Sequence, residues 1–131
     1  MIKISDLQAG DIVMADYEGQ LSRGVVTALN KEDREVSVET AVQTYWYTPD
    51  QLFAVPVDDS QLQLLGFEKE NVADGSIKYK KGPFRIVVQK EGDFSKVEMW
   101  YREDHRHFHE PLYVHQLQNH YYQMTKVELV P

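Results

Sequence analysis

The chain has 131 residues, of which 42% are hydrophobic and 27% charged, and its formal net charge is −7. This composition is that of an ordinary globular protein, with no apolar run near 18 residues that could span a membrane, and the lack of cysteine excludes disulfides and thiolate chemistry. The N-terminal residues have neither the basic nor the apolar region of a secretory signal, so we expect a cytoplasmic protein.

The net charge is unevenly distributed. Residues 1–74 carry 14 acidic and 5 basic side chains, a balance of −9, and residues 75–131 carry 7 acidic and 9 basic, a balance of +2. An acidic chain repels phosphate backbones, so nucleic-acid binding is not expected of the protein as a whole. The exception is the stretch "IKYKKGPFRIVVQK" (77–90), which contains five cations and no carboxylate. A hairpin with a solvated lysine face is predicted there, and nucleic-acid contact through residues 78–90 is an alternative function.

The first half of the chain is predicted to form short strands separated by polar turns. The expected strands are 10–17, 21–30, 35–40, 41–48 and 52–57. In the third, Val36 and Val38 alternate with polar residues, which is typical of a strand with one buried face. Thr48–Gln51 has the pattern of a capping box with proline at the first helical position, which predicts one helical turn. Such strands indicate a small curled sheet or SH3-like barrel.

The second half changes character after Pro56-Val57-Asp58. Asp58 and Gln61 have the spacing of a helix N-terminus, and Gly66 suits its end, so a helix is predicted at 59–65. The strands predicted next are 67–72, 77–90 (with a break at Gly82-Pro83) and 95–101, followed by a loop at 102–110.

A final helix is predicted at 111–124, opened by Pro111. Val114, Leu117, Tyr121 and Met124 recur at helical spacing and form its expected buried face. The tail 126–131 could add a last strand.

The predicted fold class is therefore α+β. An SH3-like β lobe (1–57) would be followed by an α-β-β-β-α lobe (58–131), although the two could also form one compact domain without a true linker.

Three stretches resemble one family of short proteins. They are "KISDLQAGDIV" (3–13), "VPVDDSQLQLLGFEK" (55–69) and "YVHQLQNHYYQMTKVEL" (113–129). The family is associated with genomes and mobile elements, such as prophages, of gut Bacteroidetes, and no activity is established for it. The resemblance implies a similar chain organisation. This chain departs from it at Gln8–Asp11, where Arg-Ile-Gly-Asn is usual, and at Lys126, where the family has a glycine that ends the last helix.

All five histidines lie between His105 and His120. On a strand, His105, His107 and His109 would share one face and could bind a metal ion, with Glu110 adding a carboxylate. The charged neighbours and the lack of an apolar flank favour a polar surface loop instead. A small metal-dependent enzyme built on these three histidines is therefore an alternative function, and no cofactor is predicted.

Two other groups of side chains are candidate binding residues. Within the final helix His115, Gln118, Asn119 and Tyr122 form a polar-aromatic strip, which is either a recognition surface or a set of side chains that bond to backbone where the helix docks. In "TYWY" (44–47) the side chains of Tyr45 and Tyr47 share a face and, if exposed, would suit a peptide groove or a stacking platform.

No nucleophile, nucleotide-binding or metalloprotease motif is recognisable in the sequence. The leading hypothesis is a non-enzymatic binding or accessory protein, encoded on a mobile element, that engages a protein partner through Tyr45 and Tyr47 or through the strip from His115 to Tyr122.

Overall fold

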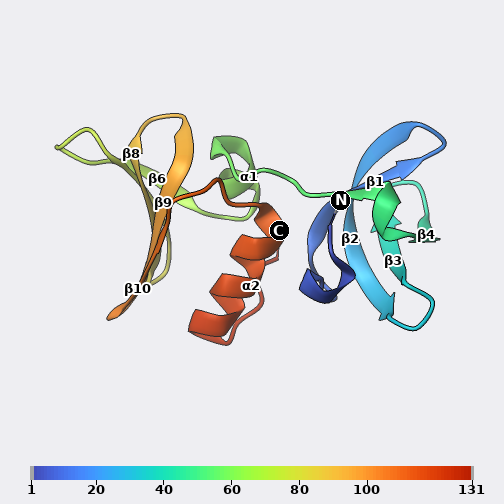
Figure 1. Ribbon diagram of the computed structural model, residues 1–131. Coiled ribbons are helices and arrows are strands. Elements are labelled where there is room, and N and C mark those ends of the chain that lie inside the picture. The colour runs from blue at the N-terminus through green and yellow to red at the C-terminus, as the bar shows by residue number, and fades with distance from the viewer. Residues whose placement is uncertain (1, 131) are drawn as a thin grey trace. The chain divides into compact units, whose positions relative to one another are not determined.

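The computed structural model describes residues 2–130. The chain divides into two compact units. The first holds the residues up to Val55 together with Val114–Gln116, and the second holds Pro56–Tyr113 and the residues from Leu117 onward. Each unit contains one antiparallel five-stranded sheet (Figure 1). The predicted α+β class is confirmed, with strands forming most of the ordered elements.

The first sheet is a meander with one added strand. Its strands are β1 (Ile12–Tyr17), β2 (Gln20–Asn30), β3 (Glu35–Thr40), β4 (Thr44–Tyr47) and β5 (Leu52–Phe53). They lie in the order β4-β3-β2-β1-β5, so the last strand returns to pair with the first. Within the described residues no ladder joins β4 to β5, so the sheet is open and the expectation of a closed barrel is not met.

Two short 3-10 helices accompany this sheet, η1 (Ile4–Asp6) and η2 (Pro49–Gln51). The capping box predicted at Thr48 is confirmed, because the Gln51 Oε1 atom accepts the Thr48 backbone N–H at 3.0 Å. Proline at the first position costs the turn no hydrogen bond, since the first N–H groups of a helix have no partner inside it. This turn reverses the chain after β4, so that β5 pairs with β1.

The core of the first unit is aliphatic with one tyrosine. Its buried members come from the residues on either side of η1 and from all five strands. They are Ile2, Leu7, Val13, Ala15, Val26, Val36, Val38, Tyr47 and Leu52. The alternation predicted for residues 35–40 places Val36 and Val38 in this core, as expected for a strand with one buried face.

The second sheet is an uninterrupted meander. Its strands are β6 (Glu68–Asn71), β7 (Ile77–Lys81), β8 (Phe84–Lys90), β9 (Asp93–Tyr101) and β10 (Asp104–Phe108). The break predicted at Gly82-Pro83 is confirmed, because residues 77–90 form two strands of a hairpin joined by a tight turn at Gly82. The loop predicted at 102–110 was wrong, because residues 104–108 form the edge strand β10. An edge strand is held by backbone bonds to one neighbour, so its side chains need no apolar alternation.

The helices are α1 (Asp59–Leu64) and α2 (Val114–Thr125). The predicted ends of the first are confirmed, because the Asp58 carboxylate accepts the Gln61 N–H at 2.8 Å and Gly66 has a φ of +89°. The second begins later than Pro111. Leu112 and the residue after it are extended, and the Leu112 carbonyl accepts the Val57 N–H at 3.0 Å.

Helix α2 and the tail differ from prediction at one further place. The helix ends where Lys126 takes a φ of +64° and donates its N–H to the Tyr122 carbonyl at 2.8 Å. Residues 126–130 form no strand, and Pro131 lies outside the described residues. Leu129 is nevertheless buried, and its carbonyl accepts a hydrogen bond from the Gln118 side chain at 2.9 Å.

In the second unit the core lies between one face of the sheet and the helices (Figure 1). The Phe84 ring packs at 4.7 Å from the Tyr121 ring of α2 and at 6.1 Å from the Phe67 ring that follows α1. Of the predicted helix face, Leu117 and Tyr121 are buried in this unit, Val114 is buried in the first unit, and Met124 is only half-buried. No helix in the described part of the chain is long and apolar enough to cross a membrane.

Candidate functional site

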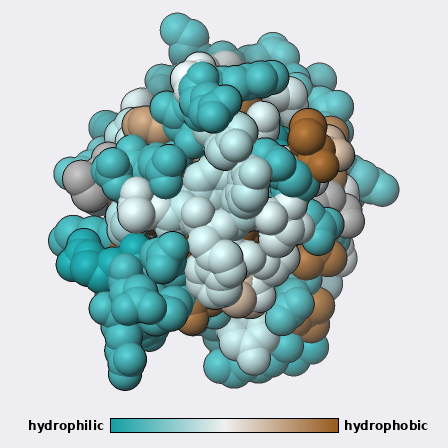
Figure 2. All heavy atoms as spheres, turned by 90° about the vertical axis from the view of Figure 1, so that its right-hand side faces the viewer, coloured by the Kyte–Doolittle hydropathy of each residue, from teal (hydrophilic) through white to brown (hydrophobic). Residues whose placement is uncertain are grey.

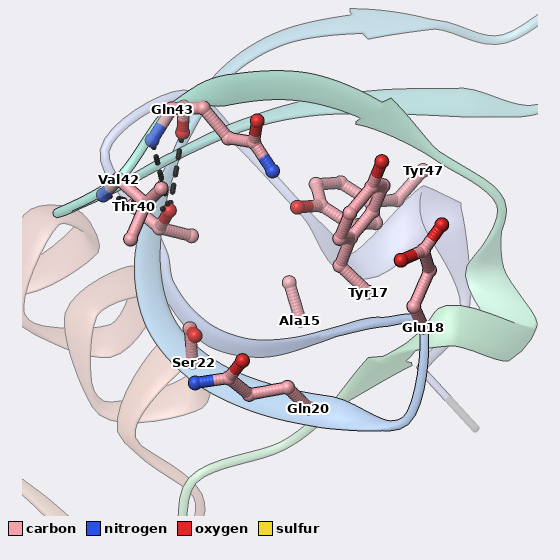
Figure 3. Close-up of a pocket in the computed structure, with 9 residues that line it drawn as sticks. All are labelled: Ala15, Tyr17, Glu18, Gln20, Ser22, Thr40, Val42, Gln43 and Tyr47. Carbon is pink, nitrogen blue, oxygen red and sulfur yellow. Dashed lines mark hydrogen bonds between the residues drawn. The ribbon is translucent and has the colours of Figure 1, made fainter.

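A cavity of about 380 Å³ opens in the first unit (Figure 3). We call it the tyrosine pocket and define it by its lining residues, which come from β1, β2, the ends of β3 and β4, and the two turns between these strands. They are Ala15, Tyr17, Glu18, Gln20, Ser22, Thr40, Val42, Gln43 and Tyr47. Its volume lies within the range of small-ligand sites, at the lower end.

The turn between β1 and β2 supplies one wall of the tyrosine pocket. Tyr17 pairs with Gln20, which leaves a two-residue connection in which Glu18 and Gly19 both have positive φ, +51° and +85°. The Asp16 side chain accepts the Gly19 N–H at 2.9 Å and so fixes the turn. A turn of this kind matches the twist of the two strands but normally has Asn, Asp or Gly at its first position. Here that position holds a glutamate.

Three tyrosines are in contact at the pocket. The Tyr17 and Tyr45 rings stack with centroids 4.9 Å apart, and their hydroxyl oxygens are 3.4 Å from each other. The Tyr45 ring meets the Tyr47 ring edge to face at 6.3 Å. Tyr17 and Tyr45 are each 40% exposed, whereas Tyr47 is buried and its hydroxyl points toward the cavity (Figure 3).

The phenols of Tyr17 and Tyr47 stay protonated over the physiological range. The hydrogen bond with Tyr45 and the nearby Glu18 carboxylate raise the pKa of Tyr17 to about 12. Burial raises the pKa of Tyr47 above its ordinary value. Neutral hydroxyls can both donate and accept, so the tyrosines offer the pocket polar contacts as well as ring faces.

The turn between β3 and β4 forms the opposite wall. The Thr40 hydroxyl donates to the Gln43 carbonyl at 3.1 Å and accepts the Val42 N–H at 3.3 Å, which closes the turn. Because these bonds hold the backbone, the Gln43 side chain is free of the turn and extends over the cavity (Figure 3). The Val42 side chain is 82% exposed at the rim.

The charge of the lining has one sign. Glu18 is the only lining residue that is charged at neutral pH, and the lining contains no lysine, arginine or histidine. The remaining side chains that can bond are amides and hydroxyls. The pocket therefore offers a carboxylate, neutral hydrogen-bonding groups and aromatic faces, which is a set suited to a polar or cationic group rather than to an anion.

Of the predicted binding residues, Tyr45 and Tyr47 are brought together at this pocket. They share a face as the alternation indicated, but only Tyr45 is exposed, because Tyr47 packs into the core of the first unit. Sequence reasoning missed Tyr17 and Glu18. The sequence signal for them was the pair Glu18-Gly19 after Asp16-Tyr17. It has the form of a two-residue hairpin turn in which glutamate occupies the position where Asn is usual.

The predicted strip on α2 is mostly inaccessible. His115 and Gln118 are buried, Asn119 is half-buried and only Tyr122 is largely exposed. Gln118 bonds to a backbone carbonyl of the tail, and burial lowers the pKa of His115 below its ordinary value, with Asp6 acting in the opposite direction. Of the two interpretations, side chains that bond to backbone describe Gln118 better than a recognition surface does.

The clustered histidines lie on and after the edge strand β10. The His105 ring stacks on the Trp100 ring at 3.7 Å, and the His107 and His109 rings stack at 4.5 Å. The Glu98 carboxylate lies 3.7 Å from the His105 Nε2 atom and 3.9 Å from the His107 Nδ1 atom. Among residues 2–130 no group of three or more His, Asp or Glu side chains is arranged to hold a metal ion. The metal alternative stays a prediction.

Another histidine of α2 holds the edge strand in place. The Arg106 Nη1 atom lies 2.7 Å from the His120 Nδ1 atom and donates to the Gln123 Oε1 atom at 2.9 Å. Burial, and then the charge of Arg106, lower the pKa of His120, which favours the neutral ring that accepts this bond. The role of His120 is thus to fasten β10 to α2, a contact that the sequence pattern did not reveal.

Part of the predicted basic hairpin is engaged within the second unit. Lys80 forms an ion pair with Glu70 at 3.1 Å, and Lys81 donates to the Leu65 carbonyl at the end of α1 at 2.7 Å. The Arg85 guanidinium lies over the Trp100 ring, 5.9 Å from its centroid. These contacts reduce the charge that the hairpin can offer to phosphates.

Figure 2 shows one face of the molecule, where residues of intermediate hydropathy occupy the middle, hydrophilic residues surround them and hydrophobic ones form small separate areas. Tyrosine, tryptophan, serine and threonine have such intermediate hydropathy.

Comparison with protein-family models, with curated proteins and with solved structures found no significant match. A function for this chain therefore rests on the geometry of its described residues.

Proposed function

We propose that the protein is a binding module that holds a segment of a protein partner at the tyrosine pocket. The observation that carries this proposal is the stacked pair of Tyr17, which lines the cavity, and Tyr45, which packs on it; both large aromatic side chains stay 40% exposed. Tyrosine is enriched at protein interfaces because it buries a large area at a low cost in side-chain entropy and keeps a polar group.

The surroundings of the pocket support a peptide-like occupant. Val42 is a large hydrophobic side chain that is exposed at the rim of the pocket. An exposed hydrophobic side chain beside a polar centre is typical of a surface that covers an extended ligand. We include in the proposal an SH3-like arrangement of the first unit, which is supported by the return of β5 to β1 and by the 3-10 turn η2 just before it.

The setting of this function is also part of the proposal. The resemblance of three stretches to proteins of mobile elements supports an accessory role, and the composition supports a cytoplasmic location. The partner would be encoded by the same element or by its host.

The test is a capture experiment with matched variants. Immobilised wild-type protein and the variant Tyr17→Ala/Tyr45→Ala are incubated with lysate of the native host, and bound proteins are identified by mass spectrometry. The control is Tyr122→Ala, which removes a similarly exposed tyrosine from the second unit. Circular dichroism and urea denaturation show that each variant is folded.

We expect at least one protein to be retained by the wild type and by Tyr122→Ala and lost from the double variant. A partner that binds the double variant as well as the wild type would place the interface elsewhere and would overturn the proposal.

A further inference from the structure

We propose that the group recognised in the tyrosine pocket is the ammonium of a lysine side chain of the partner protein; this rests on the function proposed above. The inference concerns what enters the cavity, and it follows from four properties of the lining: its charge, its ring faces, its backbone conformation and its size.

Charge favours a cation. Glu18 is the only charged residue among the nine that line the pocket. The whole segment 1–55 contains nine acidic and four basic residues, so the field around the cavity is also negative. An anionic ligand would meet a carboxylate with no compensating cation in the lining, whereas a cation would meet an opposite charge.

The ring faces favour the same ligand. The negative face of a tyrosine ring attracts an ammonium held within about 6 Å of its centroid. Tyr17 and Tyr47 border the cavity from one side, and Glu18 follows Tyr17 at the same end (Figure 3). The rest of the lining includes the Gln20, Ser22 and Gln43 side chains, whose oxygens can accept the remaining N–H groups of an ammonium.

The backbone conformation at Glu18 indicates that placing a glutamate there costs conformational free energy. A residue with a side chain is disfavoured at a φ of +51°, and the position would accept Asn or Gly with less strain. Strained positions concentrate at functional sites, where the strain holds a group in place. Here the turn directs Glu18 to the mouth of the pocket.

Size and exposure favour a side chain on a peptide. A volume of about 380 Å³ has room for one lysine side chain. The compact ammonium has three donors on a flexible stem and needs no planar slot of the kind that a guanidinium fills. The exposed Val42 at the rim then offers a contact to the chain that carries the lysine.

The experiment is an NMR titration of the ¹⁵N-labelled full chain with three peptides. They have the sequence Gly-Xaa-Gly with blocked ends, where Xaa is lysine, norleucine or arginine. We expect the lysine peptide to shift the amide signals of Glu18 and Gln43, the norleucine peptide to bind at least tenfold more weakly and the arginine peptide to bind more weakly than lysine.

Charge variants test the role of Glu18. Glu18→Gln keeps the size of the side chain and its backbone strain, and we expect it to weaken binding of the lysine peptide at least tenfold. Glu39→Gln removes one negative charge from an exposed position of the same unit, outside the pocket, and should change binding less than twofold.

Equal binding of the lysine and norleucine peptides, or equal losses in the two glutamine variants, would overturn the inference. If no peptide binds but a captured partner still depends on Tyr17 and Tyr45, the inference fails and the proposed binding function stands. If the partner also binds the double tyrosine variant, both fail.

Discussion

Tyr79, in the middle of β7, donates its hydroxyl hydrogen to the Asp59 carboxylate in the first turn of α1, with 2.6 Å between the two oxygens. The Tyr79 side chain is fully buried, and the Asp59 carboxylate also lies 3.1 Å from the Lys69 ammonium. The bond joins the helix to the sheet on the core face of the second unit. A hydrogen bond to an ionised acceptor is stronger than one between neutral groups.

Changing Tyr79 to phenylalanine should destabilise the second unit. The change removes a hydrogen bond to a charged acceptor while it keeps the ring in the core, so we expect a loss of about 1–2 kcal/mol in the free energy of unfolding. Urea denaturation followed by circular dichroism measures it. Tyr122→Phe, at an exposed position, is the control and should leave the midpoint unchanged.

The same carboxylate should make stability depend on pH. The hydrogen bond from Tyr79, and then Lys69, lower the pKa of Asp59 below its ordinary value. A lowered pKa in the folded state means that the stabilisation is present above the unfolded pKa, near 4 for aspartate, and is lost as the pH falls through the folded value. In Asp59→Asn the urea midpoint should therefore fall less between about pH 5 and pH 2 than in the wild type.

Glu18→Asn should separate stability from binding. Asparagine adopts positive φ more readily than glutamate, so we expect the free energy of unfolding to rise by up to about 1 kcal/mol, while binding at the tyrosine pocket is lost. Arg34→Asn relieves a similar φ of +54° outside the pocket and should raise stability without affecting binding. A less stable Glu18→Asn protein would mean that the glutamate serves the turn itself.

Gly24 lies where two neighbouring strands leave no room for a side chain. An added Cβ atom would be 2.6 Å from the Val38 Cγ1 atom and 2.8 Å from the Glu39 carbonyl oxygen. The backbone oxygen cannot move aside without breaking the pairing of β2 with β3, so Gly24→Ala should cost about 1–3 kcal/mol. A denaturant midpoint close to that of the wild type would show that β2 shifts more easily than this contact indicates.

Lys126→Gly should stabilise the end of α2. The lysine occupies the left-handed conformation that commonly ends a helix. Glycine adopts this conformation without strain, which stabilises the folded state. Glycine also raises the entropy of the unfolded chain, but this destabilising effect is smaller than the strain removed. The expected gain is about 0.5–1 kcal/mol. Lys126→Ala keeps the strain and is the matched control, which should show no gain in thermal melting temperature.

Local signals in the sequence predicted elements well where a side chain bonds to its own backbone. The capping box at Thr48 and the N-cap at Asp58 are such signals, because their partners lie three residues away. The start of α2 was placed too early for the opposite reason. Pro111 is compatible with a helix start, but Leu112 pairs with Val57, which lies far away in the sequence.

The candidate site was predicted only in part because it is assembled from two hairpin turns. Alternation showed that Tyr45 and Tyr47 share a face, but it cannot show which neighbours cover them. Tyr17 and Tyr45 lie on β1 and β4, which β2 and β3 separate, so the two rings meet only because the sheet curls. A pattern confined to one strand contains no information about that distance.

The outer strands of the two sheets differ in charge. In the second sheet, β6 carries Glu68, Lys69 and Glu70, and β10 carries Asp104 and Arg106 among its histidines. Charged edges of this kind resist pairing with another chain. In the first sheet the outer strands β4, Thr-Tyr-Trp-Tyr, and β5, Leu-Phe, have no charged residue, so an added strand would meet less resistance at these edges than at those of the second sheet. The longer of the two, the aromatic β4, offers more backbone groups for a second chain to pair with.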